Sequence, residues 1–287
     1  MLTFGSLFAG IGGFDLGFER AGMQCKWQVE IDPYCQKVLA KHWPNVRRHD
    51  DVRTFPPPAW VQCECCDNFL CTWHGGHAHD CPETECPELE VWDGEWGMNP
   101  YEEAHPNWKV DVICGGFPCQ PISNAGKRLG DSDERCLWPE FARVIRELRP
   151  RYAVLENVGA LTVRGLRSVV GGLCSIGFDA EWTVLPASAF GAAHRRERLF
   201  IIAHATGDGL EGRNTAAGIS KAPTAPLDNV RDWPELSEPF GIRSRDGIPD
   251  YVDRIRGLGN AVVPQIAEWI GRRIVEAHAE HERTTDA

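Results

Sequence analysis

The cysteine at position 119 has the surroundings of a reactive nucleophile. Residues 115–121 read Gly-Gly-Phe-Pro-Cys-Gln-Pro and follow directly on the apolar run Val110–Cys114. Such a run predicts a buried strand, and α/β proteins place their ligands at the carboxyl ends of parallel strands. A partly ionised thiol in that position is a good nucleophile. The alternative is a cysteine packed as a small apolar side chain, which fits poorly beside Pro118 and Gln120 in a rigid polar loop.

Two further groups that can do chemistry stand at the ends of other apolar runs. Glu156 follows the run Tyr152–Leu155, at the same predicted sheet edge as Cys119. A partly buried carboxyl group there can be protonated and donate a hydrogen bond to a ring nitrogen; otherwise it caps a helix or forms a salt bridge. Arg196 and Arg198 precede a further apolar run, and their spacing puts both on one side of a strand. There they can hold a phosphate or carboxylate, although a solvated charge run is the alternative.

A glycine-rich turn lies near the N-terminus, where residues 8–14 read Phe-Ala-Gly-Ile-Gly-Gly-Phe. Glycines between a strand and a helix let the backbone approach a ligand closely. Glu30 ends the second predicted strand and can accept hydrogen bonds from ribose hydroxyls, and Asp51 ends the next and can serve an adenine. The Gly-x-Gly-Gly spacing counts against a dinucleotide, and an ordinary tight turn stays an alternative.

The elements that must position these groups alternate along the chain. Short β-rich runs and amphipathic stretches predict an α/β fold with a doubly wound, mainly parallel sheet. Asp32 reads as an N-cap and Pro33 as the first residue of a helix, while Pro150 stops another. Helices are predicted over 14–21, 33–42, 138–148 and 263–278, and strands over 3–8, 28–31, 110–114, 152–155 and 199–203.

The composition of the 287-residue chain is that of a globular protein, with 43% apolar and 25% charged residues. No apolar run approaches the roughly 18 residues that a membrane span needs. The N-terminus lacks the layout of a secretory signal, so we expect a cytoplasmic protein. A formal net charge of −11 by itself counts against a nucleic-acid partner.

That charge belongs to one segment. Residues 61–108 contain 11 Asp and Glu and no Lys or Arg, which leaves 30 acidic and 30 basic residues elsewhere. We therefore read this segment as an insertion that faces away from phosphates or contacts a partner protein. It also contains six of the 12 cysteines.

The cysteine and histidine spacing of the insertion predicts a structural zinc site. Cys63, Cys66, Cys71 and His74 offer four ligands at spacings that can surround tetrahedral zinc. A segment with few aliphatic residues needs such a staple to order itself. Free thiols in an acidic loop are the alternative, and the ligand choice and a second ion stay open because four more residues can serve: His77, His79, Cys81 and Cys86.

Together and in this order, the motifs resemble the cytosine-C5 DNA methyltransferase family. The matching pieces are Phe8–Gly13, Glu30, Asp51, Pro118-Cys119-Gln120, Glu156-Asn157-Val158, Arg195–Arg198 and Gly259-Asn260-Ala261-Val262. The resemblance implies S-adenosylmethionine as methyl donor. It implies that the donor is held by Phe8, Gly10, Ile11, Gly12, Glu30, Asp51, Pro118, Asn260 and Val262.

The resemblance also implies a mechanism. Cys119 adds to C6 of a cytosine that is flipped out of the duplex, and Glu156 interacts with N3 and the exocyclic amine. Arg196 supports the pyrimidine carbonyl, and Arg198 orders Cys119 or Glu156. Gln120 and Ser123 contact DNA from the loop, and Arg243 and Arg245 contact it from the target-recognition region.

The expected organisation has three parts. Residues 1–205 form the catalytic domain, interrupted by the insertion at 61–108. Residues 206–250 form a small irregular target-recognition region, and 251–287 return to the catalytic domain. We expect a monomer that acts on double-stranded DNA and has no contact with a membrane. An RNA substrate and a non-catalytic binding module are the alternatives; Gln120 favours DNA over RNA, and the intact Cys119, Glu156 and Arg196 favour an enzyme.

Overall fold

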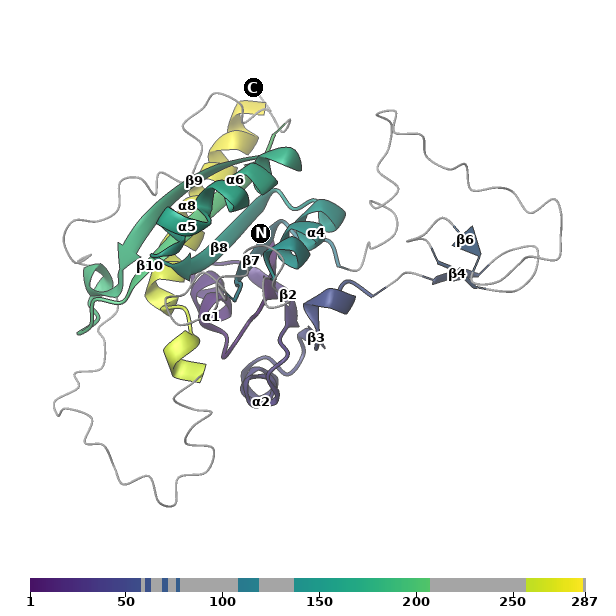
Figure 1. The fold of residues 1–287 in the computed structure, drawn as a ribbon, viewed down its shortest axis with the longest axis horizontal. Coiled ribbons are helices and arrows are strands. Elements are labelled where there is room, and N and C mark those ends of the chain that lie inside the picture. Colours follow the sequence, from purple (N-terminus) through teal and green to yellow (C-terminus); the bar gives the residue numbers. More distant parts are fainter. Residues whose placement is uncertain are drawn as a thin grey trace, which may run out of the picture.

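Seven strands form the central sheet of the protein, in the order β3-β2-β1-β7-β8-β10-β9 (Figure 1). The computed structural model describes residues 1–57, 60–62, 69–71, 76–77, 108–118, 137–206 and 257–285. Strands β3, β2, β1, β7 and β8 pair in parallel, and β10 runs antiparallel to both of its neighbours. The prediction of a mainly parallel α/β sheet is confirmed. The strands are β1 (Thr3–Leu7), β2 (Gln24–Val29), β3 (Arg47–His49), β7 (Val112–Gly116), β8 (Tyr152–Val158), β9 (Phe178–Pro186) and β10 (Glu197–Ala205).

Local signals explain where two of the helices begin and end. Asp32 accepts hydrogen bonds from the backbone N–H groups of Tyr34 and Cys35, and Pro33 opens α2 as predicted. Helix α4 also has the predicted bounds and ends before Pro150. The described helices are α1 (Gly13–Arg20), α2 (Pro33–His42), α4 (Trp138–Leu148), α5 (Leu161–Arg164), α6 (Leu166–Ser175) and α8 (Pro264–Thr285), with 3₁₀ turns η1 (Val52–Thr54) and η3 (Ala187–Phe190).

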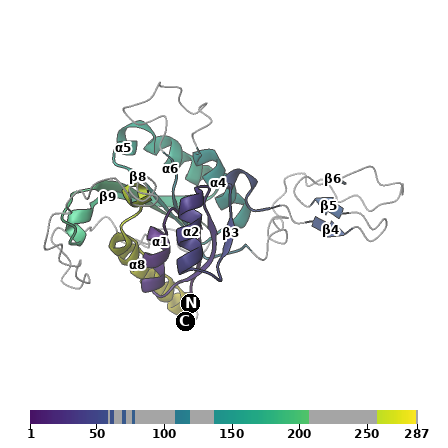
Figure 2. The same cartoon turned by 90° about the horizontal axis from the view of Figure 1, so that it is seen from below.

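Helices cover both faces of the sheet. Figure 2 shows α1 and α8 on one side and α4, α5 and α6 on the other. Strand β7 is buried on both faces: Val112 and Cys114 share a core with α1 and α8, whereas Ile113 shares one with α4 and α6. Helix α8, from the end of the chain, lies against α1, from its beginning. This contact brings residues 257–263 to the glycine-rich turn.

The structure extends the sequence prediction in several places. Strand β2 begins at Gln24 rather than position 28, and β8 continues to Val158, so Glu156 belongs to the strand rather than to a following loop. Strand β9 and helix α6 were not predicted. The middle of β9 lies on the sheet edge and is only partly buried, which weakens its apolar pattern. Helix α6 contains Gly171 and Gly172, which disfavour a helix.

The acidic insertion departs from and returns to the sheet at one place. The rings of Phe55, which precedes the insertion, and Trp108, its last residue, meet at 5.1 Å between centroids. The indole of Trp27 donates a hydrogen bond to the carbonyl of Trp108 over 2.8 Å. Inside the insertion the described backbone forms a small antiparallel sheet of β4 (Trp60–Gln62), β5 (Phe69–Cys71) and β6 (Gly76–His77). Among the described residues, no helix is long and apolar enough to cross a membrane.

Candidate active site

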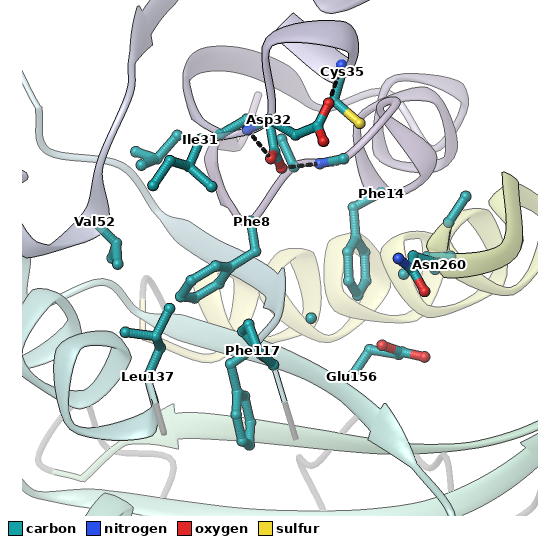
Figure 3. Close-up of a pocket in the computed structure, with 18 of the residues that line it drawn as sticks. Phe8, Phe14, Ile31, Asp32, Cys35, Val52, Phe117, Leu137, Glu156 and Asn260 are labelled. Atoms are coloured by element: carbon teal, nitrogen blue, oxygen red, sulfur yellow. Dashed lines mark hydrogen bonds between the residues drawn. The ribbon is translucent and has the colours of Figure 1, made fainter. Parts of the chain in front are cut away.

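A cavity of about 510 Å³ lies where β1, β2, β7 and β8 end. Its wall includes residues that follow these strands or end them: Phe8, Glu30, Phe117 and Glu156. Figure 3 shows the rings of Phe8 and Phe14 between Asp32 and Glu156. One continuous cavity therefore joins the glycine-rich turn to the carboxyl group of Glu156.

The backbone holds Glu30 at one side of the cavity. Its Oε2 accepts a hydrogen bond from the N–H of Gly10 over 2.7 Å, and its Oε1 accepts one from the N–H of Asp32 over 2.8 Å. Burial raises the pKa of this carboxyl group, and the backbone hydrogen bonds oppose the shift. Each oxygen keeps a further lone pair, so Glu30 can accept hydroxyl hydrogen bonds from a ligand without giving up its place.

The glycine-rich turn contributes to the cavity with some of its residues. Gly10 and Gly13 line it, but Ile11 and Gly12 do not, which differs from the expectation for these two positions. Gly12 is the N-cap of α1 and faces the ring of Trp43, and Ile11 lies beside Gly257. Both positions shape the turn instead of forming the cavity wall.

A segment from the end of the chain closes this side of the cavity. Asn260 and Val262, for which the resemblance implies cofactor contacts, line it. A Cβ at Gly13 would lie 2.3 Å from the carbonyl oxygen of Val262. Position 13 therefore needs a glycine, because any larger residue would push the segment away from the turn.

Asp51 lies on the cavity wall with its carboxylate already engaged. It accepts hydrogen bonds from the backbone N–H of Arg53 at 3.0 Å and from the guanidinium of the same residue at 2.7–3.0 Å. These bonds lower the pKa of Asp51. Asp51, Val52 and Arg53 all line the cavity, so the turn η1 forms one wall of it.

Glu156 is buried at the opposite end of the cavity. Its Oε1 lies 3.0 Å from Nε of Arg198, which also lines the cavity. A Cβ at Gly116 would lie 2.7 Å from Oε2, so the glycine there leaves room for the carboxyl group. Burial raises the pKa of Glu156 to about 7, and the charges of Arg198 and Arg196 oppose this shift. Near neutral pH the group can donate a proton or a hydrogen bond.

Asn157 joins two strand ends and was not assigned a separate role from the sequence. Its side-chain amide donates to the carbonyl of Phe117 over 3.0 Å, and its amide oxygen accepts from the N–H of Val158 over 2.8 Å. Asn157 is buried. It holds the backbone two residues before Cys119, and Pro118, in between, lines the cavity.

The two arginines before β10 have different partners, so the alternative in which both hold one phosphate or carboxylate does not describe them. Arg196 donates to the carbonyls of Gly259 and Ala261, each over 2.7 Å, and does not line the cavity. Its φ of 32° is in the left-handed region, so the side-chain alternation of a strand does not extend to it. Arg196 holds the C-terminal segment, and Arg198 pairs with Glu156.

Several predicted residues lie outside the described ranges, and the zinc ligands are among them. For the predicted zinc ligand Cys71 and the alternate ligand His77, the structure describes only the backbone. Within the described ranges, no three His, Cys, Asp or Glu side chains are grouped so that they could hold a metal ion. The predicted residues that lie wholly outside the described ranges are Cys119, Gln120, Ser123, Arg243, Arg245, Cys63, Cys66, His74, His79, Cys81 and Cys86.

The sequence model of one family, described as C-5 cytosine-specific DNA methylase, matches residues 2–57 and 99–239. The chain belongs to this family. The match is interrupted over 58–98. This gap begins just before the acidic segment 61–108 and otherwise lies within it. The resemblance inferred from the motifs is confirmed.

Curated relatives in this methylase family cover most of the chain. The type II methyltransferase M.XorII of Xanthomonas oryzae pv. oryzae is 30% identical over 261 residues, which are 88% of this chain and 52% of that protein. The type II methyltransferase M.BsuFI of Bacillus subtilis is 26% identical over 265 residues, 88% of this chain and 53% of the relative. The chain thus spans about half the length of the curated relatives it matches.

A solved structure supports the same fold. The S. pombe Dnmt2 methyltransferase superposes with a TM-score of 0.50 at 14% identity, covering 80% of this chain and 57% of that one. At this identity the comparison concerns the fold alone. It agrees with the Rossmann-like sheet that carries the cavity.

Proposed function

We propose that the protein is a DNA (cytosine-5-)-methyltransferase that transfers a methyl group from S-adenosylmethionine to cytosine C5 in duplex DNA. The observation that carries the proposal is a single cavity with two carboxyl groups at its ends. Glu30, at one end, can accept hydrogen bonds from ribose hydroxyls, and the buried Glu156, at the other, has a pKa of about 7. Membership of the methylase family and the names of its type II relatives support it.

The described residues suit S-adenosylmethionine. A volume of about 510 Å³ is within the range of cofactor sites. Glu30 can accept the ribose hydroxyls, while Phe8, Val52 and Leu137 offer apolar surface beside it. When bound, the cofactor supplies an electrophilic methyl group. We propose that Phe8, Gly10, Glu30, Asp51, Pro118, Asn260 and Val262 hold it.

The chemistry of cytosine determines what the residues at the Glu156 end of the cavity must do. C5 belongs to an aromatic ring and cannot be reached in a stacked duplex, so the base must be flipped out at a cost of a few kcal/mol. We propose that the Cys119 thiolate forms a bond to C6. The electron pair displaced from the C5–C6 bond moves toward N3, where Glu156 donates a proton or hydrogen bond, so that C5 becomes nucleophilic.

When C5 accepts the methyl group, the S–CH3 bond of the donor breaks with its electron pair left on sulfur, so that S-adenosylhomocysteine is the leaving group. The adduct must then break down. A base, which can be a water molecule, removes the C5 proton; the electrons of that bond re-form the C5–C6 double bond and Cys119 leaves as thiolate. We propose that Arg198, which pairs with Glu156, orients that carboxyl group and takes over the contact with the pyrimidine carbonyl first expected of Arg196. Arg196 completes the site by holding the segment with Asn260, which revises the direct base contact expected for it.

The organisation and surface contacts remain part of the proposal. We propose a catalytic domain of 1–205 completed by 251–287, with a target-recognition region at 206–250. Gln120, Ser123, Arg243 and Arg245 are proposed to contact DNA. The acidic insertion, by its charge, should face away from DNA.

The insertion is proposed to contain structural zinc bound by Cys63, Cys66, Cys71 and His74, with His77, His79, Cys81 and Cys86 as alternates. Elemental analysis of protein purified without a chelator should find at least one zinc ion per chain. Finding no metal in folded protein would refute this part without affecting the methyl transfer.

Methyl transfer tests the central proposal directly. The protein is incubated with labelled S-adenosylmethionine and duplex DNA of mixed sequence, and bisulfite sequencing locates the product. Cys119→Ser should abolish transfer, whereas the exposed Cys174→Ser should leave it unchanged. Labelling of RNA in preference to DNA, or tight DNA binding without any transfer, would refute the proposal.

A further inference from the structure

Arg143 of helix α4 forms a bridge to the wall of the cavity. Its Nε donates to Glu140 and its Nη1 to Glu147, both over 2.8 Å. Its Nη2 donates to the carbonyls of Val52 and Phe55 over 2.7 and 2.8 Å. Val52 and Phe55 precede Arg143 by 91 and 88 positions in the sequence. The side chain is 16% exposed and does not line the cavity itself.

The segment that Arg143 holds packs Val52 and Phe55 into the core, but few backbone hydrogen bonds hold its turn together. The turn η1 contains three residues, and its internal backbone bonds run from Thr54 N to Asp51 O and from Phe55 N to Val52 O, at 3.1 and 3.2 Å. Short 3₁₀ turns have weak hydrogen-bond geometry. Asp51, Val52 and Arg53 form the cavity wall, so the position of this wall depends on what holds the turn from outside.

Helix α4 is a rigid support for that contact. Phe141, Val144, Ile145 and Leu148 are buried in the core on its sheet-facing side. The ring of Phe141 stacks with that of Phe8, with centroids 6.1 Å apart. Glu140 and Glu147, three residues before and four after Arg143, fix the guanidinium in one orientation. Charge-assisted hydrogen bonds from one planar guanidinium to two carboxylates fix its orientation as well as contributing energy.

We propose that Arg143 is a positioning residue for cofactor binding: it holds the Asp51–Arg53 wall at the distance from Phe8 that S-adenosylmethionine requires. The inference rests on the proposed function, because that function assigns this end of the cavity to the cofactor. Arg143 acts through the backbone of Val52 and Phe55 and touches neither substrate. Its loss should therefore weaken cofactor binding and leave the chemical step intact.

The deciding variant is Arg143→Lys. Lysine keeps a positive charge between Glu140 and Glu147, but one ammonium group cannot reproduce the planar fork that reaches two carboxylates and two carbonyls. We expect the Kd of S-adenosylhomocysteine, measured by calorimetry, to rise about tenfold. The KM for S-adenosylmethionine should rise in parallel, while kcat at saturating cofactor and the KM for DNA stay within about twofold. Arg143→Met, which removes the hydrogen bonds to both glutamates and to both carbonyls, should weaken binding further.

Arg272→Lys is the matched control. Arg272 also pairs with a glutamate of its own helix, Glu268 at 2.8 Å, but it is exposed on α8 and away from the cavity. It should leave the cofactor Kd unchanged.

Each result has one interpretation. An unchanged Kd in Arg143→Lys refutes the inference, whatever happens to the melting temperature, because a purely structural role moves Tm and not the affinity of the folded protein. A change in kcat without a change in Kd refutes it as well. If the unmodified protein binds no S-adenosylhomocysteine, the proposed function fails first. If it binds and the variant binds equally, only the role of Arg143 fails.

Discussion

Arg198 and Glu156 face each other across the pair of antiparallel strands β8 and β10. Glu156 is paired in register with Phe200, two residues beyond Arg198, so the two charged side chains are diagonal neighbours. Their Nε–Oε1 distance is 3.0 Å. Despite this cation, burial raises the pKa of Glu156 to about 7. The pair thus combines an oriented carboxyl group with a proton that is available near neutral pH.

Replacing the carboxyl group of Glu156 should remove catalysis and leave cofactor binding intact. Glu156→Gln keeps the shape of the side chain but cannot deliver a proton to N3. We expect kcat for DNA methylation to fall by about 100- to 1,000-fold, with the Kd of S-adenosylhomocysteine within about twofold. The comparison is Glu197→Gln, a more exposed neighbour paired with Arg195, which should retain activity. Equal losses in both variants would contradict the role of Glu156.

The pH dependence should report the same group. If the protonated form of Glu156 is required, kcat/KM for DNA should decline above about pH 7 and approach a tenfold loss per pH unit. This follows because deprotonation of a group with a pKa of about 7 removes the donor. Initial rates between about pH 6 and pH 9 measure the decline, which should be absent from the residual activity of Glu156→Gln. A decline of the same shape in that variant would assign it to another group.

A second buried carboxyl group should control the stability of the fold. Asp15 is fully buried and accepts hydrogen bonds from Ser6, Cys25 and Gln28. Burial raises its pKa from 3.8 to about 6. The folded state then binds the proton more tightly than the unfolded state, so stability falls as the pH rises from about 4 to about 6.

Asp15→Asn should abolish this pH-dependent part of the free energy of unfolding. Between about pH 4 and pH 7 the variant should gain up to about 3 kcal/mol relative to the unmodified protein. Urea unfolding at both pH values measures the difference, and the exposed Asp179→Asn serves as comparison. A difference between the two proteins that does not change with pH would show that Asp15 does not titrate in this range.

The role of Arg196 can be separated from that of a base-contacting residue. Arg196→Met loses two hydrogen bonds to the segment 259–261, so that segment should close the cavity less firmly. We expect the KM for S-adenosylmethionine to rise about tenfold, with a smaller change in kcat. Arg195→Met, at an 80% exposed side chain, should behave like the unmodified protein. A fall in kcat at saturating cofactor with an unchanged KM would instead support direct contact with the pyrimidine.

Local signals in the sequence were enough to locate several elements. The start of α2 follows from Asp32 and Pro33, and the end of α4 follows from Pro150, because N-caps and prolines act on the residues next to them. The apolar runs placed the strands, although β2 and β8 proved longer. The edge strand β9 escaped this reading because partial burial leaves no clear pattern.

The sequence by itself also determined the family and the location of the net charge. The order of the glycine-rich turn, Glu30, Cys119 and Glu156 was sufficient to indicate the family, and the charge count assigned the net charge of −11 to residues 61–108. Residue types and spacings carry this information because the chemistry needs those groups at the ends of successive strands.

The tertiary structure alone decided which of these residues act together. Arg196 and Arg198 are alike in sequence, yet one holds a carbonyl 63 positions away and the other pairs with Glu156. The contact of Asn157 with Phe117 spans 40 positions, and that of Arg143 with Val52 spans 91. Such contacts depend on the order of strands in the sheet and on single backbone angles, such as the φ of 32° at Arg196. Neither leaves a periodic trace in the sequence.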